Sequence, residues 1–230
     1  MKKDLNAYNI FDLRDIALKR VPKGLFEFMD RGTEDEVSLR NNREVFDRIR
    51  FRTRTFRDVS KRSQETTIFG VKHKMPLVIA PTGTAGLMWY EGELALARAA
   101  RAAGIPFTLA TGSITAMERV ADEAGGELWF QLYLRSLSHE LVNRAKAAGY
   151  KALIVTVDGV SAGNREYNIR NGFTIPFTYS TRNVMDMLRH PRWLFGTMMR
   201  YLVTTGMPMY ANYPAAAKAK MTRGPMGRSS

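Results

Sequence analysis

The 230-residue sequence contains no cysteine. Without thiols it can have no disulfide framework, no thiolate zinc site and no cysteine nucleophile. It lacks a Walker loop, a Ser-His-Asp order and clustered metal-ligand spacing, so no metal site is predicted. It also lacks both the apolar segment of a signal peptide and a run of about 18 apolar residues, the length that a membrane-spanning helix needs. We therefore expect a soluble or surface-associated cytoplasmic protein whose chemistry depends on other side chains.

Acidic residues are scarce as well, with 22 Asp and Glu against 35 Lys and Arg and a net charge of +13. In residues 176–230, eight basic residues accompany a single acidic one, Asp186, giving this part +7. A second basic stretch, RIRFRTRTFR (48–57), alternates Arg with apolar residues or Thr. This period of two predicts a strand with one solvated basic face. Because such charge also suits anionic partners, a non-catalytic basic module whose +7 tail (176–230) binds a membrane surface or nucleic acid is an alternative function. No known nucleic-acid motif is present.

The rest of the sequence alternates predicted helices and strands. Two N-terminal helices are predicted at 6–20, with Asn9 as N-cap, and at 22–32. Strands follow at 76–83, 105–111, 127–133 and 152–158, and helices at 91–104, 115–126 and 138–150. Thr115 and Glu118 have the spacing of a capping box at the start of the second of these helices. This order predicts a parallel βα architecture, and a further helix is predicted within 190–208.

Two parallel architectures compete, a doubly wound sheet and a TIM (βα)8 barrel. The turn PTGTAG (81–86) lacks the G-x-G-x-x-G spacing of a dinucleotide-binding sheet. Instead, each predicted strand ends in groups suited to a site, including Thr82, Thr111, Gln131 and Thr156, as in a barrel. A barrel needs about 250 residues, and only 72 follow residue 158. We therefore expect an incomplete barrel with four strands, its first half at 76–158, followed by a basic loop and tail at 176–230.

Several polar side chains share faces at these strand ends. Alternation places Gln131 with Tyr133, and Thr156 with Asp158. Arg165, in a glycine-bounded loop, could pair in a bidentate way with a carboxylate. Each has a simpler explanation too, since buried Gln, Thr and Asp are often bonded within a core and loop arginines are often solvated.

Other features are less informative. His73, His139 and His190 end none of the predicted strands, so we expect each to be structural or exposed rather than a general base. The stretch WLFGTMMRYLV (193–203) is apolar with basic flanks, which suits either a buried helix or a helix lying in a membrane interface.

Taken together, the residues resemble the FMN-dependent α-hydroxy-acid dehydrogenase family, which includes glycolate oxidase, L-lactate dehydrogenase and mandelate dehydrogenase. The resemblance is closest to the bacterial membrane-associated lactate and mandelate branch. The motifs that carry it run in family order from about residue 5 to 213: PKGLFEFMDRGTEDE (22–36), MPLVIAPTG (75–83), EGELALARAARAAGIPFTLAT (91–111), LWFQLY (128–133), TVD (156–158), GNRE (163–166) and HPRW (190–193).

The resemblance implies FMN as cofactor and assigns roles to individual residues. The cofactor-binding residues that it implies are Pro81, Thr82, Gly83, Ala110, Gln131 and Thr156. It implies that Tyr133 and Arg165 bind the substrate. Phe28 would be a substrate-site residue without the hydroxyl of the family's usual Tyr, and Ala110 stands where a Ser is common. Tyr133 and Asp158 would be catalytic, with Asp158 orienting a histidine that the family brings from a later strand and that this sequence lacks.

The implied reaction is oxidation of an L-2-hydroxy acid, lactate-like or mandelate-like, to the 2-keto acid. Gly83, where many family oxidases have Ala, resembles dehydrogenases that pass electrons to a membrane carrier. On this resemblance we expect residues 1–230 to be the N-terminal portion of such a domain, truncated and inactive as given. We expect the full-length protein to be a homo-oligomer, peripheral on the inner face of the cytoplasmic membrane, with no nucleic-acid partner.

Overall fold

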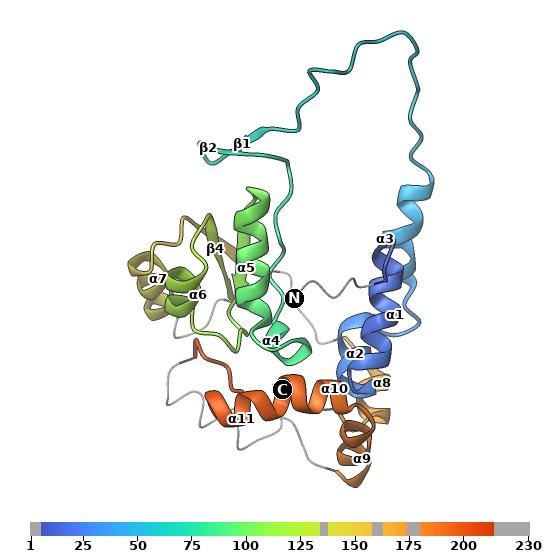
Figure 1. Cartoon of the computed structure of the whole chain (residues 1–230), viewed down its shortest axis with the longest axis vertical. Helices are drawn as coiled ribbons and strands as arrows, with labels where there is room; N and C mark the ends of the chain where they lie inside the picture. The colour runs from blue at the N-terminus through green and yellow to red at the C-terminus, as the bar shows by residue number, and fades with distance from the viewer. Residues whose placement is uncertain (1–5, 134–137, 158–162, 174–179, 214–230) are drawn as a thin grey trace.

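The computed structural model describes residues 6–133, 138–157, 163–173 and 180–213 (Figure 1). Asp158 and residues 176–179 and 214–230 of the tail lie outside these residues. A helical group contains α1 (Ile10–Arg20), α2 (Lys23–Asp30), α3 (Val37–Asp47), α8 (Glu166–Arg170) and α9 (Thr181–Arg189). It stands to one side of a small sheet with its own helices, and α10 (Pro191–Trp193), η1 (Leu194–Met199) and α11 (Arg200–Thr204) run beneath both.

The sheet is parallel and its strand order follows the sequence. β3 (Phe107–Ala110) pairs with β4 (Leu128–Tyr133), which pairs with β5 (Ala152–Thr156). Each crossover passes through one helix, α6 (Met117–Glu123) or α7 (Ser138–Ala147), while α5 (Gly92–Ala103) precedes β3. A doubly wound sheet reverses its strand order at a switch point, and the described strands do not. The order is that of an incomplete barrel, as predicted.

The predicted first strand at 76–83 is much shorter than expected. It is reduced to one parallel bridge between Ile79 and Phe107, fixed by hydrogen bonds from Ile79 N to Pro106 O and from Thr108 N to Ile79 O, both 3.0 Å. Pro76 and Pro81 lie on either side of the bridge, and proline has no N–H to donate to a ladder.

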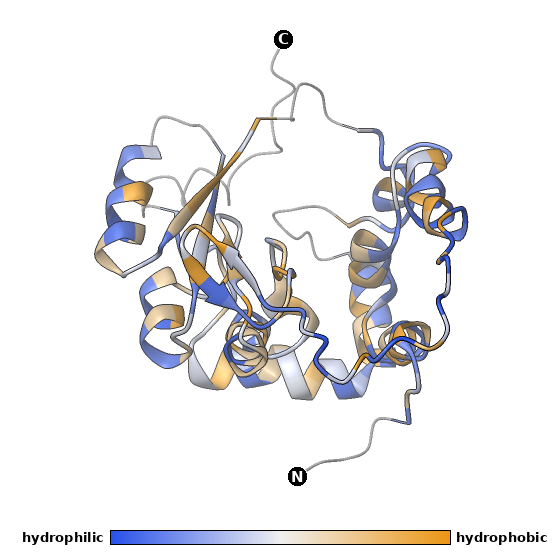
Figure 2. Ribbon diagram, turned by 90° about the horizontal axis from the view of Figure 1, so that it is seen from above, coloured by the Kyte–Doolittle hydropathy of each residue, from blue (hydrophilic) through white to orange (hydrophobic). Residues whose placement is uncertain are grey.

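The main core lies between this sheet and its helices. Phe130 and Leu109 are fully buried, and they pack with Leu94 of α5, Val120 of α6 and Leu141 of α7. Seen from above, the strands carry helices along one side, and the helical group lies across from them (Figure 2). Because strand side chains alternate, the residues between these core positions, such as Gln131, face away from the helices.

A short antiparallel hairpin precedes the sheet, with strands β1 (Thr66–Ile68) and β2 (Val71–His73). The ring of Phe69 at its turn packs edge-on against Trp129 near the start of β4, with centroids 5.4 Å apart. The hairpin therefore covers the amino-terminal end of the parallel strands and leaves their carboxyl ends to form a site.

The predicted basic strand at 48–57 was wrong. These residues belong to none of the strands of the described structure, and they form part of the long arm in Figure 1. The apolar positions are as exposed as the basic ones, since Phe51 is 93% exposed and Phe56 is fully exposed. Alternation alone did not produce a strand because none of the described strands lies beside residues 48–57 and pairs with them.

Helix boundaries were predicted to within a few residues, but their caps and continuity were not always right. Asn9 caps α1 through bonds from Phe11 N and Asp12 N, as predicted. The capping box at Thr115 and Glu118 was wrong: α6 begins at Met117, and Thr115 bonds to a buried glutamate of α5. The helix predicted within 190–208 is divided into α10, the π-helix η1 and α11. In the described parts of the chain, no helix has the length and apolar character needed to cross a membrane.

Candidate active site

Hydrogen bonds connect the carboxyl ends of three neighbouring strands. The side-chain oxygen of Gln131 accepts from Thr111 N (3.2 Å), and its side-chain nitrogen donates to Thr156 Oγ1 (2.8 Å). Thr111 Oγ1 donates in turn to the backbone oxygen of Gln131 (2.5 Å). Gln131 is only 3% exposed, so these bonds fix the direction of its amide, oxygen toward β3 and nitrogen toward β5. The structure thus brings the predicted residues Gln131 and Thr156 into direct contact.

The turn at Pro81, Thr82 and Gly83 lies beside the end of β3. It follows the Ile79 bridge, and Thr84 N donates to Gly112 O at 3.0 Å. A Cβ added to Gly83 would lie 3.6 Å from Gly112 O, an ordinary contact, so alanine would also fit at this position. The predicted residues 81–83 are therefore close to the hydrogen-bonded group of Thr111, Gln131 and Thr156, here called the ladder.

Small residues surround the buried amide. Ala110 is paired with Gln131 in the sheet register and is 5% exposed, and Gly112, two residues further on, lies close to Gly83. On the same face of β3, Thr108 has a buried hydroxyl without a partner among the described residues. Amide and hydroxyl groups next to such small residues suit a flat, hydrogen-bonding ring at the strand ends.

Tyr133 ends β4 on the same face as Gln131. It pairs with Thr156 in the register and is 47% exposed. Its phenol is thus placed on the solvent side of the buried amide, where a small polar ligand could reach it.

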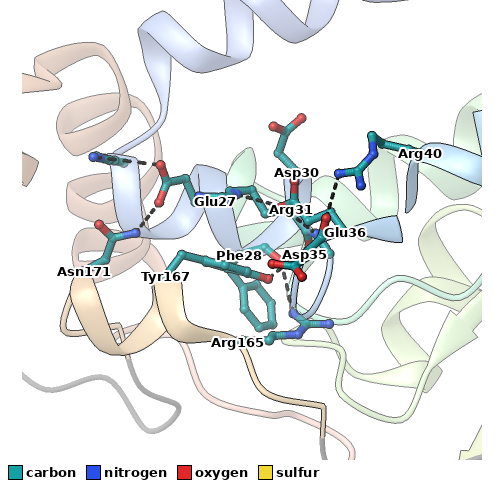
Figure 3. A network of polar contacts seen from close by, with 12 residues as sticks. Glu27, Phe28, Asp30, Arg31, Asp35, Glu36, Arg40, Arg165, Tyr167 and Asn171 are labelled. Carbon is teal, nitrogen blue, oxygen red and sulfur yellow. Dashed lines mark hydrogen bonds and ion pairs between the residues drawn. The ribbon is translucent and has the colours of Figure 1, made fainter. Parts of the chain in front are cut away.

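Phe28 and Arg165 form a second group, in the helical part (Figure 3). The guanidinium of Arg165 lies 5.3 Å from the centre of the Phe28 ring, and its Nη1 donates to Phe28 O at 3.3 Å. Glu34 N donates to Asn164 O at 3.0 Å. A Cβ on Gly163 would lie 2.5 Å from Thr33 Cγ2, so only glycine allows the loop carrying Arg165 to approach this closely.

A polar network holds the chain around Phe28 rigid. Arg31 Nε donates to Glu36 Oε1 at 2.8 Å, and this bond holds the pKa of Glu36 below its usual value. The Tyr167 hydroxyl donates to Arg31 O at 3.1 Å, and the Arg31 guanidinium lies over the Tyr167 ring. These contacts join the end of α2 to α8, the two elements beside which Phe28 and Arg165 lie (Figure 3).

The two groups do not touch. Within the described residues, no hydrogen bond or ring contact joins Phe28 or Arg165 to Tyr133 or Gln131. Sequence reasoning noted Thr111 as a strand-end group but missed its bonds to Gln131. It also missed Glu93, a 1% exposed carboxylate that accepts from Ile114 N (3.3 Å) and Thr115 Oγ1 (3.0 Å) and so holds the loop after β3. No periodicity distinguishes a glutamate that caps a loop from one in an ordinary first turn.

None of the three histidines lies at the carboxyl ends of β3, β4 or β5. His73 does end a strand, contrary to expectation, but that strand is β2 of the antiparallel hairpin. His139 is exposed on α7. His190 follows α9, with Nδ1 3.5 Å from Asp186 Oδ1.

A pocket of about 100 Å³ opens between α2, α9 and η1, and it is mainly apolar. Its lining includes Phe173, Met187 and Trp193, with Asn183 and Asp186 as polar members. None of the predicted site residues lines it, so this pocket is separate from the strand-end site.

Comparison with known proteins decides between chemistries that such a site could support. The family described as FMN-dependent dehydrogenase matches residues 17–226. The chain belongs to this FMN-dependent dehydrogenase family. The small residues, the buried amide and the hydroxyls at the strand ends of this family member fit the flavin that the family uses.

Among the relatives of this chain, (S)-mandelate dehydrogenase of Pseudomonas putida is 40% identical over 218 residues, 94% of this chain and 54% of the relative. A putative L-lactate dehydrogenase of Mycobacterium tuberculosis (strain ATCC 25618 / H37Rv) is 44% identical over 82% of this chain and 47% of its own length. A crystal structure described as monotopic membrane protein (S)-mandelate dehydrogenase matches with a TM-score of 0.86 and 39% identity, over 98% of this chain and 61% of that one. The chain thus spans about half the length of the curated relatives it matches.

Proposed function

We propose that the chain forms the N-terminal part of an FMN-dependent dehydrogenase that oxidises an L-2-hydroxy acid, lactate-like or mandelate-like, to the 2-keto acid. The observation that carries the proposal is the ladder of Thr111, Gln131 and Thr156 beside the turn at 81–83, in a chain of this family. The ladder and the turn lie where a barrel holds its functional groups, at the carboxyl ends of the strands.

Gln131 and Thr156 would hold the hydrogen-bonding edge of the flavin, with the backbone of Pro81, Thr82 and Gly83 alongside and Ala110 beneath. FMN supplies an acceptor for the two electrons of the oxidised hydroxy acid. Because the Gln131 amide is already fixed by two neighbours, it needs no reorganisation to present its remaining N–H and lone pair.

Tyr133 and Arg165 would bind the substrate. The Arg165 guanidinium now donates one bond, to Phe28 O, and its remaining N–H groups can bind a carboxylate in a bidentate way. Phe28 contributes an apolar ring and no hydroxyl. Asp158 would orient the group that removes the substrate's proton. Since no histidine of this chain lies at the carboxyl ends of β3, β4 or β5, we expect residues 1–230 by themselves to bind the substrate and cofactor without turnover.

We also propose peripheral association with the anionic inner face of a membrane and electron transfer to a membrane carrier. Apolar side chains stand out from the segment that follows α8, with Leu188 57%, Phe195 66% and Val203 82% exposed. Basic residues Arg189, Arg192 and Arg200 lie among them, which is the composition of an interfacial helix. One similar structure is described as monotopic. The full-length protein would be a homo-oligomer.

The test joins residues 1–213 to the remaining βα units of the Pseudomonas putida (S)-mandelate dehydrogenase. Flavin absorbance after purification and dye reduction with (S)-mandelate or L-lactate are the readouts. We expect bound FMN and turnover, and an Arg165→Met variant that keeps FMN and loses turnover. A folded chimera without FMN would refute the proposal.

The exposed arm supports a second candidate function, a basic module for anionic surfaces. Arg50, Arg52 and Arg54 are exposed there together with Phe51 and Phe56. Replacing the three arginines with Gln and measuring sedimentation with anionic vesicles and binding to an oligonucleotide separates the two candidates. Arm-dependent binding by a chain without flavin affinity would favour the second.

A further inference from the structure

Residues 181–213, here called the capping segment, pack into the core of the helical group and also contact the ends of several helices. The first four N–H groups and last four C=O groups of a helix have no partner within the helix. In α2, α5 and α6 the N-cap residues Pro22, Glu91 and Ala116 make no side-chain capping bond. Each of these three helix starts is instead bonded by a side chain of the capping segment.

The three bonds are short and come from different parts of the capping segment. Lys23 N at the start of α2 donates to Asp186 Oδ2 at 2.7 Å. Glu91 N at the start of α5 donates to the Tyr201 hydroxyl at 2.8 Å. Met117 N at the start of α6 donates to Asn212 Oδ1 at 2.9 Å.

A fourth bond ends a helix. Trp193 Nε1 donates to Leu87 O in α4 (Ala85–Met88) at 2.7 Å, and Trp193 is 2% exposed. The capping segment therefore supplies end contacts to four helices, in both the helical group and the barrel, which agrees with its course beneath them in Figure 1.

The last part of the capping segment reaches the strand-end site. Ala211 N donates to Ser113 O at 3.0 Å, and the Tyr210 ring adjoins Gly112. Asn212 is fully buried, and its backbone oxygen accepts from Arg144 Nη1 at 2.8 Å. The loop from Thr111 to Ala116 is thus held at its middle by Ala211 and at its far end by Asn212.

We propose that the capping segment is a clamp that sets the position of the Thr111–Ala116 loop, and that Asn212 is the positioning residue through which it acts. The loop begins with Thr111, which donates to Gln131, so on the proposed function the clamp fixes one side of the flavin site. Leu188 and Val203 of the same segment are exposed, so the clamp also carries side chains that the proposed membrane association would use.

Two substitutions of Asn212 separate the loss of its capping oxygen from other effects. Its Nδ2 is buried without a partner among the described residues, while its Oδ1 accepts from Met117 N. Asn212→Asp keeps the accepting oxygen, places a negative charge at a helix start, where it is favourable, and leaves Arg144 nearby. Asn212→Leu keeps the approximate volume and removes the acceptor. A matched control is Asn42→Leu on the exposed surface of α3.

The experiment measures hydrogen–deuterium exchange of the full 230-residue chain, without FMN. For Asn212→Leu we expect about fivefold faster exchange in peptides covering 111–120, the factor that corresponds to loss of a typical cap, and no change in the core of β4. Asn212→Asp and Asn42→Leu should exchange as the unaltered chain does. If Asn212→Leu does not fold, Tyr201→Phe should show the same local effect in peptides covering 89–96.

Uniform loosening of the whole chain, or no change at 111–120, would overturn the clamp. The exchange rates do not depend on flavin binding, so they test the clamp even if the proposed function is wrong. In the chimera with the mandelate dehydrogenase half, Asn212→Leu should also weaken FMN binding several-fold while Asn212→Asp restores it.

Discussion

The ladder between Gln131 and Thr156 makes a quantitative prediction about stability. In Gln131→Leu, Thr111 N loses its side-chain acceptor in a buried place, since Gln131 and Thr111 are 3% and 1% exposed. An unsatisfied buried donor costs about 1–3 kcal/mol. Thr156, which is half-buried, can turn its hydroxyl to solvent, so most of the cost comes from Thr111. We expect Gln131→Leu to lower the free energy of unfolding by about 2 kcal/mol.

The bond itself can be isolated with a double-mutant cycle. Thr156→Val removes the hydroxyl that accepts from Gln131 Nε2 and keeps the side-chain shape. Because one bond joins the two side chains, the double variant should lose less than the two single variants added together, by about 1 kcal/mol. Thr53→Val on the exposed arm serves as control and should change the free energy by less than about 0.5 kcal/mol.

The assay is equilibrium unfolding in urea, followed by far-UV circular dichroism and by tryptophan fluorescence, to which Trp129, two residues from Gln131, contributes with Trp89 and Trp193. Both probes should give the same midpoint for each variant. A coupling energy below about 0.3 kcal/mol would show that the Gln131 amide does not bond to Thr156, and the argument that this amide is preorganised for a flavin edge would fail with it.

Arg165→Lys loses the guanidinium that faces Phe28. It should cost under about 0.5 kcal/mol of stability and yet abolish most turnover in the chimera. Unchanged turnover would contradict the assignment of Arg165 as a substrate-binding residue. The Arg144 bond lowers the pKa of Glu118, so this pair stabilises the fold above the unfolded-state pKa, and the stabilisation is lost as pH falls through the lowered pKa. Glu118→Gln should cost under about 1 kcal/mol at pH 7, and its urea midpoint should converge with that of the unaltered chain as the pH falls below the lowered pKa of Glu118. Val155→Lys adds a charge to the 40% exposed outer face of β5 and should reduce light scattering of the concentrated chain without lowering its unfolding midpoint, because charged edges resist strand pairing.

The last of these predictions rests on the exposed outer face of β5. Leu153 and Val155 of β5 are 42% and 40% exposed, although a strand in a closed barrel has both faces covered. Apolar residues at these positions show that the sequence of β5 is suited to a neighbour and a covering helix.

The local part of the fold was predictable from the sequence because it depends on short-range patterns. Three of the four barrel strands, the helices between them and the Asn9 cap follow from periodicity and punctuation. The basic arm was misread because alternation at 48–57 has the same appearance with or without a pairing edge. The capping box was misread because Thr115 has a better partner in Glu93, 22 residues away, and no local pattern contains that information.

The candidate site was predictable to the same extent. The strand ends that carry Gln131 and Thr156 were located from alternation, and the resemblance supplied their roles. The bonds that orient them come from Thr111 on a neighbouring strand, and the placement of Arg165 comes from Gly163 against Thr33. Both are contacts between segments distant in sequence, so only the folded chain could show them.

Such long-range contacts also decide how the two halves of the site stand relative to each other. The ladder at Gln131 belongs to the sheet, whereas Phe28 and Arg165 belong to the helical group, and no described contact joins them directly. The capping segment contacts both, through Asp186 at the start of α2 and through Asn212 at the start of α6. An enzyme that must hold a substrate carboxylate at a fixed distance from a flavin needs this spacing to be rigid. On the proposed function, the capping segment therefore helps to set the distance between the two halves, together with the contact of Arg20 with the Trp89 ring, and changes in that segment should alter substrate position.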